Sequence, residues 1–174
     1  MIRRQPIIML IAVIVVLAAG FAGSQVVLAQ INQAPEQPIG YTHKTHAGDL
    51  GIACTFCHRN ADKGANASVP AVQQCMFCHS VVTGESTQAK NEIAKVRAAF
   101  ANERPLDWRR IHRLPDHVRF VHQAHISAGF TCATCHGDVA STTKVGQVRN
   151  LKMGDCVACH RTNNAPTDCT TCHK

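Results

Sequence analysis

Every cysteine in this chain belongs to one of five copies of the pattern Cys-x-x-Cys-His. Two thiols at this spacing bond to the two vinyl groups of one porphyrin, and the histidine that follows binds the iron, so the pattern predicts attachment of a c-type haem. We number the five expected haems 1 to 5 along the chain. The attachment cysteines are Cys54 and Cys57, Cys75 and Cys78, Cys132 and Cys135, Cys156 and Cys159, and Cys169 and Cys172. The predicted proximal iron ligands are His58, His79, His136, His160 and His173.

Other uses of cysteine do not account for this pattern. A structural zinc site takes four ligands, usually from two Cys-x-x-Cys units, and five units cannot be divided into such pairs. A disulfide scaffold has no need of a histidine after every second cysteine. A redox-active Cys-x-x-Cys disulfide would occur once, beside a βαβ pattern. Five covalently bound c-type haems remain as the prediction.

The fold class follows from how few large apolar side chains remain for a core. The chain has one Trp, one Tyr and six Phe, and many of its aliphatic residues lie in the amino-terminal segment. A domain of this size normally builds its interior from such side chains. We therefore predict a mostly irregular domain with short α-helices, without strands, wrapped around porphyrins that serve as its interior.

The positive charge does not indicate a nucleic-acid partner. The formal net charge is +7. Five ferric haems, each with a net charge of about −1, lower this to about +2, because the charge of a bound cofactor belongs in the total. The excess of basic residues then compensates haem propionates. The predicted propionate partners are Arg109, Arg110, Arg113 and Arg119.

The first 29 residues predict a transmembrane anchor. Arg3 and Arg4 precede an apolar run from 7 to 22 that continues at 26–29. A spanning helix needs about 20 mostly apolar residues, and the basic residues ahead of it favour a cytoplasmic amino terminus. The alternative is a signal peptide cleaved after Ala29. We favour an uncleaved single-pass anchor; either alternative puts the haem domain on the periplasmic face.

The remaining chain divides into a linker and a duplicated haem domain. Residues 30–40 are polar and contain two prolines, which is typical of a linker. The haem domain, 41–174, carries the block aromatic-x-His-x-x-His twice, at Tyr41 and at Phe120, each time shortly before a haem motif. We place haems 1 and 2 in 41–82 and haems 3 to 5 in 108–174. A linking helix is expected at 86–104, with Ser86 as its N-cap and Pro105 after its end.

Six histidines lie outside the motifs and can bind the far side of the irons. They are His43, His46, His112, His117, His122 and His125. Within each aromatic-x-His-x-x-His block the two histidines share one helical face, so each can reach a different haem. We expect His112 or His117 at haem 2, and Met153 is a rival ligand for one site, where a thioether would raise the haem potential.

This ligand count predicts an electron carrier and no catalytic residues. Six histidines and one methionine are enough to close all five irons. A closed iron cannot bind a substrate, and none of the five motifs carries a lysine in place of its histidine. We therefore expect a conductor of electrons that is not itself an enzyme.

In the order of its motifs, the chain resembles the pentahaem, membrane-anchored cytochrome c subunit of alternative complex III, a quinol-oxidising respiratory or photosynthetic assembly. The blocks that carry the resemblance are His43-Lys-Thr-His46-Ala-Gly48, Gly51-Ile-Ala-Cys54, Arg110-Ile-His112-Arg-Leu-Pro115-Asp-His117-Val-Arg-Phe120, the His122 and His125 pair, and Met153-Gly-Asp-Cys156-Val-Ala-Cys159-His160-Arg161.

The resemblance implies partners for the chain. These are an iron–sulfur/molybdopterin-oxidoreductase-like subunit, a polytopic quinol-binding membrane subunit, and a monohaem cytochrome c or blue-copper acceptor. A resemblance of the paired histidines to class III multihaem cytochromes implies that His43 binds haem 1, that His122 binds haem 3, and that His46 and His125 cross to other haems. The alternatives are a stand-alone membrane-anchored quinol dehydrogenase that feeds a periplasmic reductase, a nitrite or hydroxylamine-type reductase, and a freely diffusing carrier.

Overall fold

The computed structural model describes residues 5–31 and 34–173, and within the first helix the side chains of residues 8–24. The chain forms two units, Met1–Gln33 and Ala34–Lys174. Arg3, Arg4 and residues 32–33 of the expected linker lie outside the described residues.

The first unit is one helix, α1, which spans Gln5–Ile31. Its described side chains are all exposed, including Met9 at 70% and Phe21 at 69%. In the described part of the chain, no helix has the combined length and hydropathy of a membrane span. The structure thus has a helix where the anchor is predicted.

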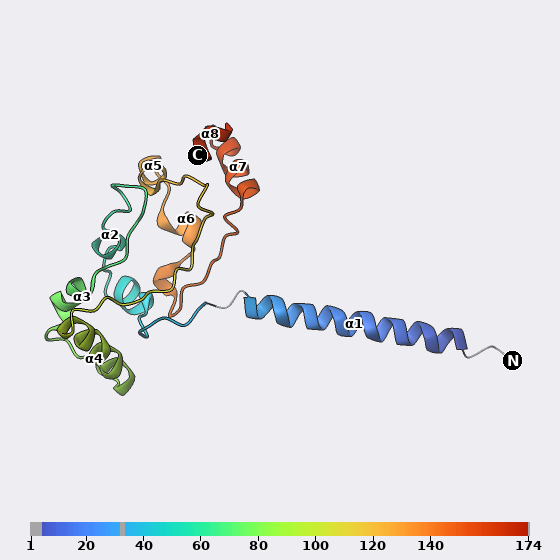
Figure 1. Cartoon of the computed structure of the whole chain (residues 1–174), viewed down its shortest axis with the longest axis horizontal. Helices are drawn as coiled ribbons and strands as arrows, with labels where there is room; N and C mark the ends of the chain where they lie inside the picture. Colours follow the sequence, from blue (N-terminus) through green and yellow to red (C-terminus); the bar gives the residue numbers. More distant parts are fainter. Residues whose placement is uncertain (1–4, 32–33, 174) are drawn as a thin grey trace. The chain divides into compact units, whose positions relative to one another are not determined.

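The second unit consists of short helices joined by long irregular segments (Figure 1). Its helical elements are η1 (Lys44–Asp49), α2 (Cys54–Cys57), α3 (Val72–His79), α4 (Thr87–Ala101), α5 (His122–Ser127), α6 (Cys132–His136), η2 (Val139–Ser141), α7 (Met153–Thr162) and α8 (Cys169–Cys172). Among the described residues there is no strand, and one isolated bridge joins Val118 to His173. The prediction of an irregular domain with short helices and no strands is confirmed.

The two cysteines of each motif lie on a helix of their own, namely α2, α3, α6, α7 and α8, and His58 and His173 directly follow α2 and α8. Residues three apart lie on the same helical face, so the two thiols of each motif project to one side, as bonding to one porphyrin requires. The carboxylate of Asp168 caps α8 by accepting a hydrogen bond from the Thr171 amide at 3.0 Å.

The linking helix α4 lies inside the segment predicted for it. Ser86 Oγ accepts a hydrogen bond from the Ala89 amide at 3.1 Å and caps the helix. The helix ends at Ala101, earlier than expected, because the chain turns through Glu103, which has a φ of 53°, before Pro105. We expected a helix between the haem groups; it instead packs on α3, the attachment helix of haem 2.

The buried side chains are few and small for a unit of this length. Ile39, Val72 and Val96 form the hydrophobic core, with Tyr41 and Trp108 among the half-buried residues around it. Among the described residues, no side chain is less than 2% exposed. Such a core removes little apolar surface from water, which agrees with an interior formed mainly by porphyrins.

Two modules within the second unit contact each other through loops that form backbone hydrogen bonds. We call residues 41–82 module 1 and residues 108–174 module 2. The loop that follows the haem 1 motif binds α5, because the His122 and Gln123 amides donate to Ala65 and Gly64 at 3.2 and 3.1 Å. The contact is reciprocal: the loop after the haem 3 motif binds η1, where the Lys44 amide donates to the Thr142 carbonyl at 2.9 Å.

Candidate haem sites

Each motif histidine faces a second imidazole from another part of the chain. The ring centroids of the five pairs are 5.5 to 6.4 Å apart. The pairs are His43 with His58, His46 with His79, His122 with His136, His125 with His160, and His117 with His173. The structure therefore brings together five of the six histidines predicted as distal ligands, each with a different motif.

These separations fit two imidazoles on one iron. A metal–imidazole nitrogen bond is about 2.0 Å long, and each ring centroid lies about 1 Å behind its nitrogen, so the centroids of two axial ligands lie about 6 Å apart. His43 and His58 are 6.4 Å apart, with 6° between their planes. His122 and His136 have the same separation and angle.

Backbone carbonyls fix which nitrogen of several rings can bind iron. The Nδ1 atoms of His58, His79 and His160 lie 2.6, 3.1 and 2.6 Å from the carbonyl oxygens of Ser68, Val82 and Pro166. A carbonyl oxygen can only accept, so Nδ1 carries the proton and donates it. Nε2 keeps its lone pair for the metal, as in other metal-binding histidines.

The distal histidines of the two modules are held in the same way. The Nδ1 atoms of His46 and His125 lie 3.0 and 2.8 Å from the carbonyl oxygens of Thr42 and Val121. The Nδ1 of His122 lies 2.7 Å from the carbonyl oxygen of Ala65. Sequence reasoning missed these partners, because any residue supplies a backbone carbonyl and the sequence therefore carries no signal for them.

An aromatic ring holds each histidine pair in the same orientation. Tyr41 is edge-on to His43 at 4.9 Å and stacked on His46 at 4.5 Å. Phe120 is edge-on to His122 at 4.8 Å and stacked on His125 at 4.5 Å. The repeat seen in the sequence is thus a repeat of side-chain geometry. Burial is the main cause that raises the pKa of Tyr41 to about 12, and nearby Cys57 and Cys75 raise it further.

The structure differs from the expectation for haem 2. The ring that faces His79 is that of His46, where His112 or His117 was expected. His117 lies beside His173 with 18° between the ring planes, close to haem 5. The reason is that His46 follows His43 by one helical turn and reaches the next haem, while residues 112–117 lead toward α8 through the Val118–His173 bridge.

Met153 is the rival ligand predicted for one site. It is the first residue of α7 and its side chain is 66% exposed. The structure therefore places it on the surface, and each of the five motif histidines already has a facing histidine.

His112 is left without a motif histidine of its own. The ring of His112 lies edge-on to the ring of His136, with 4.4 Å between the ring centroids. His136 already faces His122. The Nε2 of His112 is buried and has no hydrogen-bond partner in the protein. Burial is the main cause that lowers the pKa of His112, and it also contributes most to lowering the pKa of His136 to about 4.

The four arginines predicted as propionate partners form none of the ion pairs in the described part of the chain. Those pairs join Lys44 to Asp49, Lys95 to Glu92, Lys144 to Glu36, and Arg149 to Asp155. The role of Arg109, Arg110, Arg113 and Arg119 with propionates stays a prediction.

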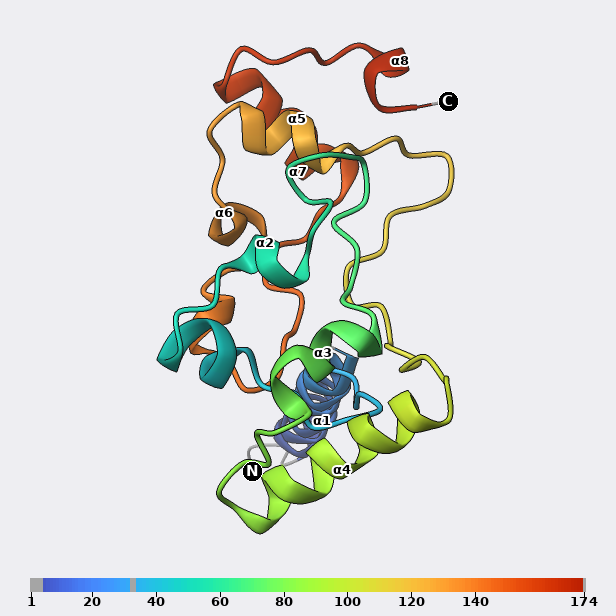
Figure 2. The ribbon, with the colours of Figure 1, turned by 90° about the vertical axis from the view of Figure 1, so that its left-hand side faces the viewer.

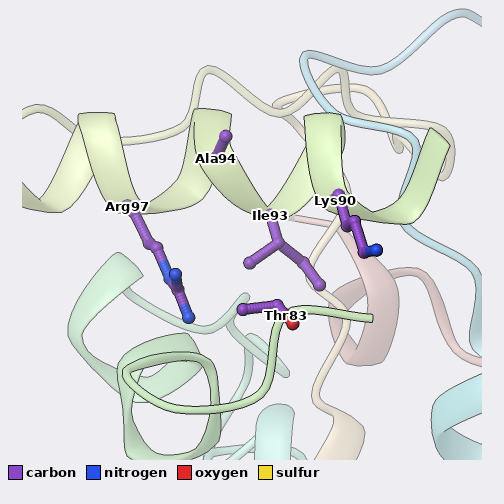
Figure 3. A pocket seen from close by; sticks show the side chains of 5 residues that line it. All are labelled: Thr83, Lys90, Ile93, Ala94 and Arg97. Atoms are coloured by element: carbon purple, nitrogen blue, oxygen red, sulfur yellow. The ribbon is translucent and has the colours of Figure 1, made fainter. Parts of the chain in front are cut away.

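A shallow pocket lies between α4 and the chain at Thr83, close to haem motif 2. In Figure 3 the side chains of Ile93 and Arg97 point from α4 toward Thr83. Arg97 Nε donates to the His79 carbonyl at 2.7 Å. This hydrogen bond connects α4 to the carboxyl end of α3. The residues that line the pocket therefore help to position haem motif 2.

Two comparisons with known proteins concern the class of this chain. Residues 118–174 match the model of the family described as cytochrome c7 and related cytochrome c. The chain is also similar to a protein of Nitratidesulfovibrio vulgaris named menaquinone reductase, multiheme cytochrome c subunit; the two are 29% identical over 80% of this chain and 77% of that protein. Residues 118–174 are thus similar to cytochrome c7 and related cytochrome c, and together with the motifs this similarity supports covalently bound c-type haem and electron transfer.

Proposed function

We propose that this chain is the electron-relay subunit of a quinone-linked membrane complex, with five c-type haems that each have two histidine ligands. The observation that carries the proposal is that each of the five motif histidines faces a different histidine from outside the motifs at a separation suited to a shared iron. The haems supply the redox chemistry, and the protein sets their spacing, orientation and potential.

Haem attachment and ligation can be tested on the full chain produced in a host with a c-type haem attachment system. The expected results are an intact mass with five haem additions, and an EPR spectrum in which all ferric haems are low-spin. Cyanide should leave this spectrum unchanged. Fewer additions would contradict the haem count, and a high-spin signal that responds to cyanide would indicate an open iron and an enzyme.

The proposed setting is the outer face of the cytoplasmic membrane, with residues 1–29 as a single-pass anchor. All described side chains of α1 are exposed, although residues 8–24 carry no charge. Apolar surface of this extent is unfavourable in water. The test is fractionation of cells that produce the full chain, with a variant that carries a cleavable signal in place of 1–29 as its control. Release of both proteins by osmotic shock would contradict the anchor.

The proposed partners are those of an alternative complex III-like assembly. They are an iron–sulfur/molybdopterin-oxidoreductase-like subunit, a polytopic quinol-binding subunit, and a periplasmic monohaem cytochrome c or blue-copper acceptor. The relative named as a subunit of menaquinone reductase supports a multisubunit, quinone-linked setting. Purification from native membranes should yield large co-migrating subunits. A single chain that oxidises quinol alone would favour the stand-alone quinol dehydrogenase.

The name of that relative also favours a second direction of flow, in which electrons reach menaquinone from a periplasmic donor. Assays on the purified complex distinguish the two directions of electron flow. Oxidation of menaquinol coupled to reduction of a periplasmic acceptor supports the first, and reduction of menaquinone by a reduced periplasmic donor supports the second.

A further inference from the structure

We infer that electrons do not pass through the haems in the order of their motifs but in the order 2–1–3–4–5, with haems 2 and 5 at the two ends. The inference rests on the proposed bis-histidine ligation. It assigns the contact between haems 1 and 3 as the junction between the modules, although 73 residues come between the two motifs.

Within each module, one pair of histidines links two haems. His43 and His46 lie one helical turn apart, and both contact the ring of Tyr41. They face His58 and His79, so haems 1 and 2 are neighbours. By the same contacts, His122 and His125 lie against Phe120 and make haems 3 and 4 neighbours.

The modules meet at haems 1 and 3. The loop of 64–65, which directly follows the haem 1 motif, binds the backbone and ring of His122, a haem 3 residue. In return, the loop of 139–142 after the haem 3 motif binds η1, which begins beside His43. The haem 1 and haem 3 residues are thus interleaved from both sides.

The thiols of the two motifs lie at this junction. Burial raises the pKa of the Cys132 thiol most, and the adjacent Cys54 thiol is the next cause. Since each attachment sulfur would bond to the edge of its own porphyrin, neighbouring sulfurs would bring two porphyrin edges together. The rate of electron tunnelling falls steeply as the distance between two porphyrin edges grows. The junction of haems 1 and 3 is therefore the route between the modules.

The haem 5 motif is bound to the segment that precedes His122, so haem 5 belongs to module 2. The Arg119 amide donates to the Cys172 carbonyl at 2.7 Å, and the isolated bridge joins Val118 to His173. His117 faces His173 from the same segment. Haem 5 is therefore attached to module 2 through the segment of 117–119.

The order of the attachment helices in space agrees with this path. Within the second unit, Figures 1 and 2 both show α3 at one end and α8 at the other. The helices α2 and α6, which carry motifs 1 and 3, lie between them, and α7 lies between α6 and α8. Haem 2 is thus farthest from haem 5.

The proposed order of haems places the points at which electrons enter and leave the protein at its two ends. Each transfer oxidises one ferrous iron and reduces its ferric neighbour, so one electron moves at each step. A quinone that exchanges two electrons does so in two such steps at one end of the line. The end at haem 2 is formed by α3 and α4, and the end at haem 5 by α8.

The order can be tested with two variants of the full holoprotein, His43→Gly and His46→Gly. Each opens one iron and makes it high-spin, and a high-spin iron broadens the EPR signals of its immediate neighbours. In the order 2–1–3–4–5, haem 1 has two neighbours and haem 2 has one. His43→Gly should therefore broaden two of the four remaining low-spin signals, and His46→Gly one.

The reverse result, one signal for His43→Gly and two for His46→Gly, is the outcome of transfer in motif order and would overturn the inference. Added imidazole should refill each site and restore five low-spin haems, which excludes misfolding as the cause. If neither variant becomes high-spin, the proposed ligation fails instead.

A second measurement needs no variant. A structure of the wild-type holoprotein should give its shortest iron–iron distance between modules for haems 1 and 3. A shortest distance between haems 2 and 3 would contradict the inference even if both variants failed to assemble.

Discussion

The Nδ1 of His122 lies 2.7 Å from the carbonyl oxygen of Ala65, a residue of the other module. A proposed haem 3 ligand is thus oriented by the loop of haem 1. Each module holds all of its own ligands, but module 2 relies on module 1 to orient His122, so assembly of haems 1 and 3 is expected to be cooperative.

Replacement of His117 by alanine should convert one haem from low-spin to high-spin. Its ring is the one that faces His173, so the loss opens the iron of haem 5. Added imidazole should restore the low-spin signal. The matched control is Met153→Leu, which removes the exposed thioether and should leave all five low-spin EPR signals in place. A high-spin haem in the methionine variant alone would reverse the assignment.

His112→Leu should keep five low-spin haems, because His112 faces no motif histidine of its own. The substitution also removes a buried Nε2 without a partner in the protein, and such a change is nearly neutral or stabilising, within about 1 kcal/mol. EPR and thermal denaturation of the holoprotein measure the two effects. Appearance of a high-spin haem would mean that His112 is a ligand.

Gly48→Ala should destabilise the contact between the modules. A methyl group there would come within 2.4 Å of the Ala140 carbonyl oxygen in η2, so the two segments must separate. Overpacking of this kind costs about 1–3 kcal/mol. Gly154→Ala is the control, since nothing lies within 4 Å and alanine favours the helix by up to about 1 kcal/mol. Equal melting temperatures for the two variants would refute the packing argument.

Tyr41→Phe should preserve the haem sites and reduce the alkaline sensitivity of the protein. Phe120 performs the same packing in module 2 without a hydroxyl. Burial is the main cause that raises the pKa of Tyr41 from 10.0 to about 12 in the folded chain. The stability that this contributes is complete below pH 10 and is lost as the pH rises toward 12. Melting temperatures measured from pH 9 to 12 should fall less in the variant; parallel curves would contradict the assignment.

Production of the chain without haem attachment should yield an unfolded second unit. Its hydrophobic core consists of Ile39, Val72 and Val96, which is too little buried apolar surface to order a segment of this length. Hydrogen exchange should show protection in the holoprotein and almost none in the haem-free chain. Protection of α3 and α4 without haem would show that this helix pair folds independently.

The class of the protein could be read from local patterns. Spacing of the cysteines and histidines within five residues predicts haem attachment, because thiols three residues apart must share a helical face whatever surrounds them. The same local reasoning anticipated short helices at the motifs, the N-cap at Ser86, and the two aromatic-x-His-x-x-His blocks. Such features depend on neighbours in the chain, which are known from the sequence.

Which histidine faces which motif was decided only by the tertiary structure. His46 meets His79 across 33 positions and His117 meets His173 across 56, and nothing local to these residues distinguishes them from His112. The segments that carry such pairs are placed by backbone hydrogen bonds between distant residues, such as that from the Arg119 amide to the Cys172 carbonyl. Backbone groups are the same in every residue, so the chain must be folded before this choice can be seen.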